Sequence, residues 1–242
     1  MLPIAKILLN STKKFKLNKL NIHEPDIYKS DLKLLKDCIY TKNVSAIGNY
    51  SNKFEKELKK ITKSKFVILT NSGTSALHIS CVLSGINNKH EVLIPAFTFV
   101  ASPNSVLYCN ADPHFVEIEE KHFGIDFKKL RSYLKKIAIK KNKFWINKKT
   151  KKIIKAIMIV HPLGYPINYG ELKKFIKEFN LIVLEDAADA LGSYYKNKHV
   201  GTFGKFGVLS FNGNKIITTG GGGAMLTQNK KYYVKALKLA KI

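Results

Sequence analysis

The sequence predicts an α/β fold in which helices cover both faces of a mixed, mostly parallel β-sheet. Short apolar runs alternate with amphipathic segments from Lys65 to Asp186, the pattern of consecutive strands and crossover helices. The chain has 242 residues, 45% of them hydrophobic, so it can bury one sizeable core but is too short for two full-sized domains. No internal repeat or low-complexity linker divides the chain.

The N-terminal region is expected to be helical. Residues 1–20 mix Ile, Leu and Lys without a cleavage site after an apolar core, which predicts an amphipathic arm rather than a signal peptide. The main domain is then expected to span residues 21–242. Its first elements are expected to be a helix from Ser30, its N-cap, to Ile39 and, after a break at Gly48, a helix from Ser51 to Ile61.

The elements of the expected sheet follow in order. Strands are expected at residues 65–70, 91–95, 114–119, 156–162, 181–186 and 207–211. A turn and helix are expected over 71–85, a loop and helix over 96–109, and helices over 127–137 and 168–179. The strongly basic segment 140–155 is expected to form a surface hairpin around Asn147 to Thr150.

The formal net charge of +25 raises nucleic acid or an anionic membrane surface as partners. The basic residues, however, are spread along the chain, and Arg131 is the single arginine. A protein that reads nucleic acid usually needs arginine for bidentate contacts and a recognisable module. No apolar run approaches transmembrane length. We therefore expect neither nucleic acid nor a membrane as a partner.

The cysteines and histidines do not indicate a metal site. Cys38, Cys81 and Cys109 lie far apart and form no ligand or redox motif, so reduced and mostly buried thiols are expected, in a cytoplasmic protein. The histidines lack metal-type spacing as well. His161 falls at the C-terminal end of an expected strand, where ligands gather in α/β proteins, but a satisfied structural histidine is the expected interpretation.

The chemistry is expected in the stretch 181–225. The apolar strand LIVLED ends on Asp186, so it delivers a carboxylate to the edge of the sheet. The strand GVLSF carries Ser210, and Lys215 follows in a polar loop before Gly220–Gly223. An amine, a carboxylate that keeps a pyridine nitrogen protonated, a hydroxyl and bare backbone amides are the groups that hold pyridoxal phosphate (PLP). A lysine outside such a setting would be a solvated surface charge.

Two further segments predict contacts to the same cofactor. Gly73 lets the backbone approach a ligand closely, and Thr74 and Ser75 place hydroxyls and free amides at a helix N-terminus, which favours a phosphate. The ordinary alternative is a capped turn between strand and helix. Phe99 follows a strand end, where its ring can stack on a planar pyridine, and the alternative is a core phenylalanine.

These residues resemble a known family. The segments EDAADALGS, GTFG and SFNGNKIITTGGGG look like the active-site half of the DegT/DnrJ family of PLP-dependent nucleotide-sugar aminotransferases, and the resemblance extends from Asn21 to the end of the chain. It is closest to the branch acting on UDP-4-keto-6-deoxy-N-acetylhexosamine, in pathways to legionaminic acid or bacillosamine-like sugars. The resemblance implies the three-layer large domain of the type I aminotransferase fold. It also implies that the C-terminal small domain is missing and that the chain is truncated at Ile242.

The resemblance implies a role for each site residue. Lys215 would bind PLP covalently and then act as the general acid and base. Asp186 would pair with the pyridine nitrogen, Phe99 would stack on the ring, and Asp189 would face the ring hydroxyl. The phosphate would be held at Gly73, Thr74, Ser75 and Ser210. No metal is expected.

The implied reaction is transfer of an amino group from glutamate to C4 of a UDP-linked 4-keto-6-deoxy sugar, for cell-surface glycan or nonulosonic acid biosynthesis. The full-length form would be a homodimer. Two alternatives stay open. A PLP-dependent sugar dehydratase shares the scaffold, but that relative has histidine in place of the lysine at position 215. In the second alternative, the chain is an inactive or partner-dependent fragment of an aminotransferase.

Overall fold

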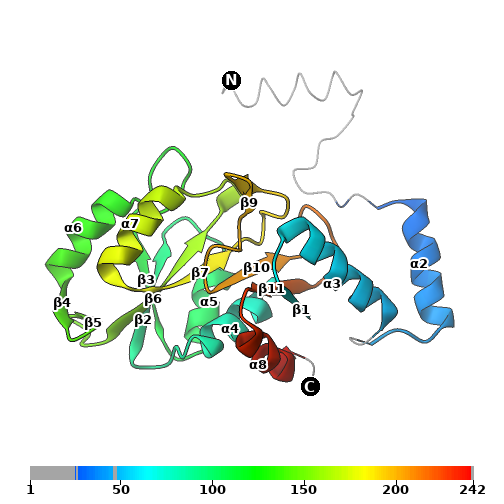
Figure 1. The fold of residues 1–242 in the computed structure, drawn as a ribbon, viewed down its shortest axis with the longest axis horizontal. Helices are drawn as coiled ribbons and strands as arrows, with labels where there is room; N and C mark the ends of the chain where they lie inside the picture. Colours follow the sequence, from blue (N-terminus) through cyan, green and yellow to red (C-terminus); the bar gives the residue numbers. More distant parts are fainter. Residues whose placement is uncertain (1–24, 26, 46–47, 241–242) are drawn as a thin grey trace.

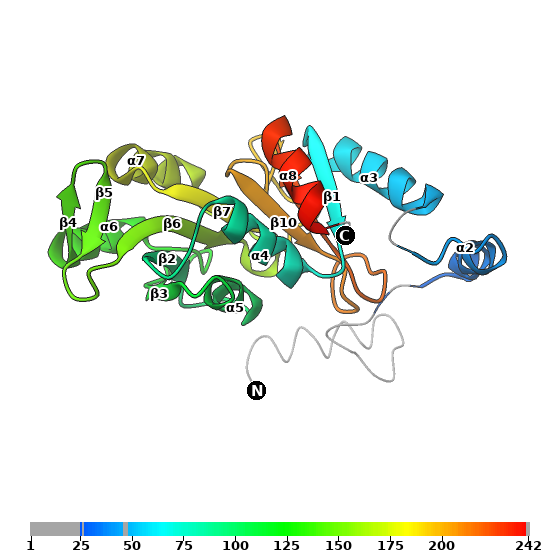
Figure 2. The same ribbon diagram turned by 90° about the horizontal axis from the view of Figure 1, so that it is seen from below.

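The computed structural model describes residues 25, 27–45 and 48–240, so the arm predicted for residues 1–20 lies outside the described part of the chain. The described residues form three layers, with a β-sheet between two sets of helices (Figures 1 and 2). The predicted α/β fold with a mixed, mostly parallel sheet is confirmed.

The main path of the sheet has the strand order β1-β11-β10-β7-β6-β2-β3. The strands are β1 (Phe66–Thr70), β2 (His90–Pro95), β3 (Asp112–Val116), β6 (Ile153–Val160), β7 (Ile182–Asp186), β10 (Phe206–Ser210) and β11 (Gly223–Thr227). Neighbours from β10 to β3 pair in parallel, whereas β11 is antiparallel to both β10 and β1. The C-terminal ends of every strand in this path except β11 therefore meet at one edge.

Two buried clusters fix the helices to opposite faces of the sheet. The helices on one face are α4 (Gly73–Leu83), α5 (Ala101–Leu107) and α8 (Lys230–Ala240), and those on the other are α3 (Asn49–Thr62), α6 (Phe127–Ile137) and α7 (Tyr169–Phe179). Successive β1 residues alternate between the clusters: Val67 shares one with Leu58 of α3, and Ile68 shares the other with Ala236 of α8. Burial of both faces explains why β2 is buried at every position.

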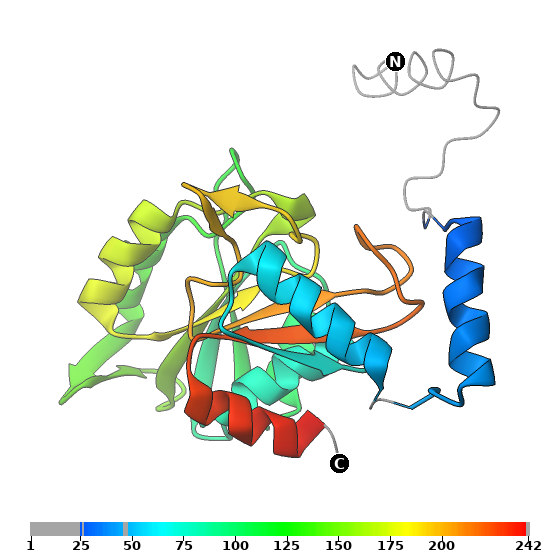
Figure 3. The ribbon, with the colours of Figure 1, turned by 45° about the vertical axis from the view of Figure 1, so that its right-hand side comes forward.

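Helix α2 (Lys29–Tyr40) stands apart from the sheet in Figures 1 and 3. It has no buried residue, and its leucines at 32, 34 and 35 are about half exposed or more. The predicted helix is confirmed, but Ser30 lies inside its first turn, and the N-cap is Tyr28, whose amide donates to the Asp31 carboxylate at 2.8 Å. No helix among the described residues is long and apolar enough to span a bilayer.

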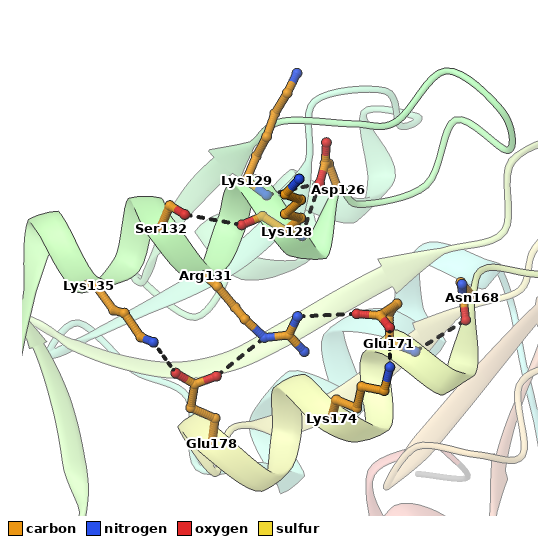
Figure 4. A network of polar contacts seen from close by, with 10 residues as sticks. All are labelled: Asp126, Lys128, Lys129, Arg131, Ser132, Lys135, Asn168, Glu171, Lys174 and Glu178. Atoms are coloured by element: carbon orange, nitrogen blue, oxygen red, sulfur yellow. Dashed lines mark hydrogen bonds and ion pairs between the residues drawn. The ribbon is translucent and has the colours of Figure 1, made fainter.

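The single arginine joins two helices on one face of the sheet (Figure 4). Arg131 of α6 contacts Glu171 at 3.2 Å and Glu178 at 3.3 Å, both on α7, and Glu178 also pairs with Lys135 at 2.8 Å. Asp126 caps α6 by accepting from the amides of residues 128 and 129. These partly exposed pairs contribute little stability each, but they account for Arg131 as a structural residue.

The basic segment adds two antiparallel strands, β4 (Ala138–Lys141) and β5 (Phe144–Asn147), beside β6. The predicted hairpin at Asn147–Thr150 is confirmed, because this turn joins β5 to β6. A further hairpin joins β4 to β5 and was not predicted. Short pairs β8 (Tyr194–Tyr195) and β9 (Lys198–His199) and a turn of 3-10 helix, Pro162–Gly164, complete the described elements.

Some predicted boundaries were wrong. The strand expected at 114–119 begins and ends earlier, at Asp112–Val116, and Ile118 instead forms an isolated bridge to Ile125. Strand β11 and helix α8 were not predicted. The four-glycine run that leads into β11 is typical of a loop, so local sequence gave a weak signal for this strand. Helix α8 does carry apolar residues at helical spacing, at positions 232, 233, 236, 237 and 240, so its pattern was overlooked.

Glu91 anchors the basic hairpin from the start of β2. Its side chain is buried and accepts hydrogen bonds from Asn147 Nδ2 at 3.2 and 3.1 Å and from the Thr150 hydroxyl, and it lies 2.7 Å from His114 Nδ1. Burial alone would raise the pKa of Glu91, but the contacts from His114, Thr150 and Asn147 outweigh burial and hold the pKa below its ordinary value.

We expect this network to make folding stability depend on pH on the acid side. A carboxyl whose pKa is lowered by folding contributes stability above its unfolded pKa, here 4.5, and that contribution is lost as the pH falls below it. Urea unfolding between about pH 7 and pH 3 should show a shallower decline for Glu91→Gln than for the wild type. Glu57→Gln, on the surface of α3, is the control and should keep the wild-type decline. An unchanged decline in Glu91→Gln would contradict the prediction.

Candidate active site

A cavity of about 490 Å³ opens at the sheet edge where the parallel strands end. Side chains reach it from the ends of β1, β6, β7 and β10 and from the segment after β2. Seven of the eight predicted site residues line it: Gly73, Thr74, Phe99, Asp186, Asp189, Ser210 and Lys215. The structure therefore brings together residues that are up to 142 positions apart in the sequence. Their individual roles remain predictions.

Lys215 lies in the loop between β10 and β11 (orange in Figure 3), with its side chain only 13% exposed. Its Nζ donates to Asp189 Oδ1 at 2.6 Å, and the same nitrogen lies 5.8 Å from the centre of the Phe99 ring. Phe99 is 70% exposed, so it forms a rim of the cavity rather than part of the core. The amine is thus held by a carboxylate beside an open aromatic face.

Asp186, the last residue of β7, is buried, and its carboxylate accepts hydrogen bonds from neighbouring residues. Its Oδ2 accepts from the Ser102 hydroxyl at 2.6 Å, and its Oδ1 accepts from the amide of Ala188 at 3.2 Å. Burial raises the pKa of the Asp186 carboxyl, with Ser102 and Ala188 acting in the opposite direction. A cation placed beside this carboxylate would be strongly favoured, because little water competes for the charge.

The N-terminus of α4 and two glycine positions form a narrow cradle beside the cavity. A Cβ at Gly73 would lie 3.0 Å from Ser210 Cβ, and one at Gly223 would lie 2.5 Å from the Gly73 nitrogen. Only glycine permits this approach at position 223. Ser72 caps α4 by accepting from the Ser75 amide, which leaves the Gly73 and Thr74 amides at the open first turn.

Ser75 is the predicted residue that the structure leaves out of this cavity. Its hydroxyl lies 3.0 Å from Ser72 Oγ, and the residue lines a neighbouring pocket between α3, α4 and α8. The Ser75 hydroxyl turns back to the cap residue Ser72 instead of entering this cavity, which explains the difference in placement. Its predicted role at the phosphate remains untested.

Sequence reasoning missed the role of Glu185, which points to the opposite face of β7 from Asp186. Its side chain is fully buried, and it accepts from the amides of Gly201, Phe203 and Gly204. These amides belong to the GTFG segment, so one carboxylate fixes the loop that leads into β10. Burial would raise the pKa of the Glu185 carboxyl, but the contacts from His161, Tyr169 and the Gly204 amide outweigh burial and lower it.

His161, which lines the cavity, and Tyr169 complete this network. The Tyr169 hydroxyl donates to Glu185 Oε2 at 2.5 Å, and His161 Nε2 lies 3.0 Å from that hydroxyl and 3.3 Å from Glu185 Oε2. Tyr169 also stacks on Phe203, with ring centres 3.7 Å apart. His161 is therefore held at Nε2, but the satisfied structural histidine that the sequence predicted is confirmed only in part, because its buried Nδ1 has no hydrogen-bond partner among the described residues.

We expect Glu185→Gln to lower the free energy of unfolding by about 3 kcal/mol, because an amide NH₂ would face donors that now share a buried carboxylate. Chemical denaturation at neutral pH measures this loss. Glu171→Gln, which removes a carboxylate from partly exposed ion pairs, should cost less than about 1 kcal/mol. Equal losses in the two variants would show that the Glu185 network does not hold the loop.

Comparison with known proteins identifies the family. Residues 25–242 match the model of the DegT/DnrJ/EryC1/StrS aminotransferase family. The chain belongs to this family. Among its curated relatives, GDP-perosamine synthase from Vibrio cholerae is 36% identical over 218 residues, covering 90% of this chain and 55% of the relative. A UDP-4-amino-4,6-dideoxy-N-acetyl-beta-L-altrosamine transaminase from Campylobacter jejuni is 34% identical over 215 residues, covering 89% and 52% respectively.

A solved structure shows the same fold. GDP-4-keto-6-deoxy-D-mannose-3-dehydratase from E. coli, determined with bound hydrated PLP, superposes with a TM-score of 0.77 and 23% identity, covering 90% of this chain and 54% of that one. The predicted large domain of the type I fold is thus confirmed. The chain spans about half the length of the curated relatives it matches.

In this member of the DegT/DnrJ/EryC1/StrS family, the cavity combines four chemical features. It has a partly buried amine at Lys215, a buried carboxylate at Asp186, an exposed aromatic face at Phe99 and free helix-end amides at Gly73 and Thr74. Such a site suits a flat aromatic ligand that carries a carbonyl at one position, a basic ring nitrogen at another and an anionic group at its end.

Proposed function

We propose that residues 21–242 form the cofactor domain of a PLP-dependent aminotransferase that acts on a nucleotide-linked keto sugar. The observation that carries this proposal is the shared cavity of Lys215 and Asp186, with the Lys215 amine held 2.6 Å from Asp189. No other lysine lines that cavity among the described residues. Membership of an aminotransferase family supports the same reaction class.

The residues fit PLP by shape as well as by chemistry. The close approach of Gly73 to Ser210 places a hydroxyl beside the first amides of α4, as a phosphate requires. Phe99 leaves its ring face open beside the Lys215 amine, as stacking requires. When bound, PLP would supply an electron sink for breaking bonds at the carbon that carries nitrogen.

The protein's own groups would divide the remaining work. Lys215 would hold the cofactor covalently and then accept and return a proton at Nζ, for which Asp189 is the neighbouring carboxylate. Asp186 would hold a proton at the ring nitrogen from its buried position at the end of β7. Gly73, Thr74 and Ser210 would bind the phosphate.

For the substrate we propose a UDP-linked 4-keto-6-deoxy amino sugar, aminated at C4 with glutamate as donor, in the legionaminic acid branch of cell-surface sugar biosynthesis. The Campylobacter jejuni transaminase, named for a UDP-sugar, supports this choice, whereas the Vibrio cholerae relative is named for a GDP-sugar. We further propose a cytoplasmic homodimer for the full-length enzyme. Sugar dehydration is the competing reaction, and Lys215 disfavours it because the dehydratase would carry histidine there.

The test uses glutamate labelled with nitrogen-15 and two keto sugars, one linked to UDP and one to GDP. The purified chain with PLP is incubated with each sugar, and the products are analysed by mass spectrometry. Labelled nitrogen in the UDP-linked product is the expected result. Label only in the GDP-linked product would overturn the nucleotide assignment, and loss of a hydroxyl without gain of nitrogen would favour the dehydratase. Failure of the chain to bind PLP at all would refute the proposed function.

A further inference from the structure

Two linked hydroxyls, that of the half-buried Thr98 and that of the buried Ser102, lead from the cavity to Asp186. Thr98, which lines the cavity after β2, has its Oγ1 2.8 Å from Ser102 Oγ, and the Ser102 hydroxyl donates to Asp186 Oδ2 at 2.6 Å. Ser102 has no exposed surface. No sequence motif singled out Ser102, and the proposed reaction leaves it without a role.

The direction of these hydrogen bonds follows from counting protons. An ionised carboxylate only accepts, so the single hydroxyl proton of Ser102 is committed to Asp186. The Ser102 oxygen can then accept from Thr98, whose proton would otherwise have only the longer contact of 3.4 Å to the Phe99 carbonyl. Asp186 therefore accepts a hydrogen bond from the Ser102 hydroxyl on one oxygen and from the Ala188 amide on the other, and these two bonds fix the plane of the carboxylate.

We propose that Ser102 is a positioning residue that keeps the Asp186 carboxylate charged and fixed in orientation, with Thr98 as the outer member of the pair of hydroxyls. The proposal rests on the proposed function in assigning Asp186 to the ring nitrogen of the cofactor. A carboxylate buried at the end of β7 loses solvation, and the Ser102 hydroxyl replaces part of it at 2.6 Å.

Other charged groups near Asp186 act in both directions. Asp189 disfavours its ionisation and Lys215 favours it, while burial is the largest influence and raises the pKa. His161, the residue after β6, donates its backbone amide to the Asp186 backbone carbonyl at 3.0 Å, while its ring contacts Glu185. Because Ser102 favours the charged form, its removal should move the pKa of Asp186 upward.

The helix that carries Ser102 also provides a matched control. Ser105 lies on α5, is equally buried, and donates its hydroxyl to the Ser102 carbonyl rather than to Asp186. Ser102→Ala and Ser105→Ala thus each remove one buried hydroxyl from the same helix. Thr98→Val removes the outer hydroxyl of the pair and leaves the hydrogen bond from Ser102 to the Asp186 carboxylate in place. If Ser102→Ala folds poorly, this variant still tests whether the two hydroxyls support Asp186.

The first measurement is carbon-13 NMR of the aspartate carboxyls in the cofactor-free protein, with Asp186→Asn used to assign the Asp186 signal. We expect Ser102→Ala to raise the Asp186 titration midpoint by about one to two pH units. Thr98→Val should raise it by less, and Ser105→Ala should leave it unchanged. An unmoved midpoint in Ser102→Ala, or an equal shift in Ser105→Ala, would overturn the proposal.

The second measurement is the half-reaction with glutamate in the PLP-loaded protein. In Ser102→Ala the acid limb of the rate profile should move to higher pH together with the NMR midpoint, while the KM for glutamate stays the same. In an Asp186→Asn background, adding Ser102→Ala should change the rate no further. If the wild type binds no PLP, the proposed function fails while the NMR result still decides the role of Ser102.

Discussion

We expect Lys215→Ala to abolish the covalent attachment of PLP to this chain. Lys215 is the lysine that lines the cavity, and its Nζ lies beside both Asp189 and the Phe99 ring, so no neighbouring amine can replace it among the described residues. After incubation with PLP and reduction with borohydride, intact-mass analysis should show one added cofactor in the wild type and none in the variant. Turnover should fall at least about a thousandfold, since the proposed nucleophile and the proposed general base would be lost together.

Lys205→Ala provides the matched control for this experiment. Lys205 precedes β10, and its Nζ lies 4.4 Å from the centre of the Tyr232 ring and outside the cavity. This variant should therefore take up the cofactor like the wild type. A reduced adduct that persists in Lys215→Ala, or that peptide mapping places on another lysine, would rule out Lys215 as the attachment site.

The strand ends were predictable because the apolar runs stop at polar residues. The run LIVLED stops at Asp186 and the run GVLSF contains Ser210, and parallel strands must place these ends at one edge. The cavity therefore contains residues that the linear sequence already marked. Apolar runs did not predict β11. This antiparallel strand begins within a glycine run, so no apolar residue marks its start.

The groups that support the site could not be predicted, because their partners are distant in sequence. Ser102 reaches Asp186 across 84 positions, and Glu185 reaches the amides of 201–204 across 16 to 19. A serine in the first turn of a short helix and a second acid beside a catalytic candidate both have ordinary interpretations when read alone. The pairing of β7 with β6 and β10 brings Glu185 next to the 201–204 loop, and this pairing is visible only in the fold.

The net charge of +25 is a property of the whole sequence that does not locate a functional site. Composition raised nucleic acid as a partner. Two of the cations have defined structural partners instead: Arg131 joins α6 to α7, and the partly buried Lys215 pairs with Asp189. A charge total does not record which cations are held by carboxylates. The structure does show these pairs, and it distinguishes Lys215, which lines the cavity, from the many lysines that lie on the surface.

We expect Asp186→Asn to leave PLP bound but to slow amino transfer by about a hundredfold to a thousandfold. The amide keeps the shape of the carboxylate, and the cofactor keeps Lys215 and the cradle at Gly73 and Ser210. The amide cannot, however, carry the negative charge that stabilises a proton on the ring nitrogen, so the electron sink weakens. Stopped-flow single turnovers with glutamate, together with the stoichiometry of bound cofactor, separate binding from chemistry.

Asp189→Asn distinguishes this loss of charge from a general change in the electrostatics of the cavity. Both variants remove one negative charge near Lys215, but Asp189 is 43% exposed and pairs with the amine, whereas Asp186 is buried and pairs with Ser102. Solvent screens an exposed charge, so Asp189→Asn should reduce the rate less and mainly alter how readily Lys215 is loaded with cofactor. A near-normal single-turnover rate in Asp186→Asn, with full cofactor occupancy, would reject Asp186 as the partner of the ring nitrogen. Equal losses in both variants would mean that the total charge of the cavity, rather than the position of Asp186, sets the rate.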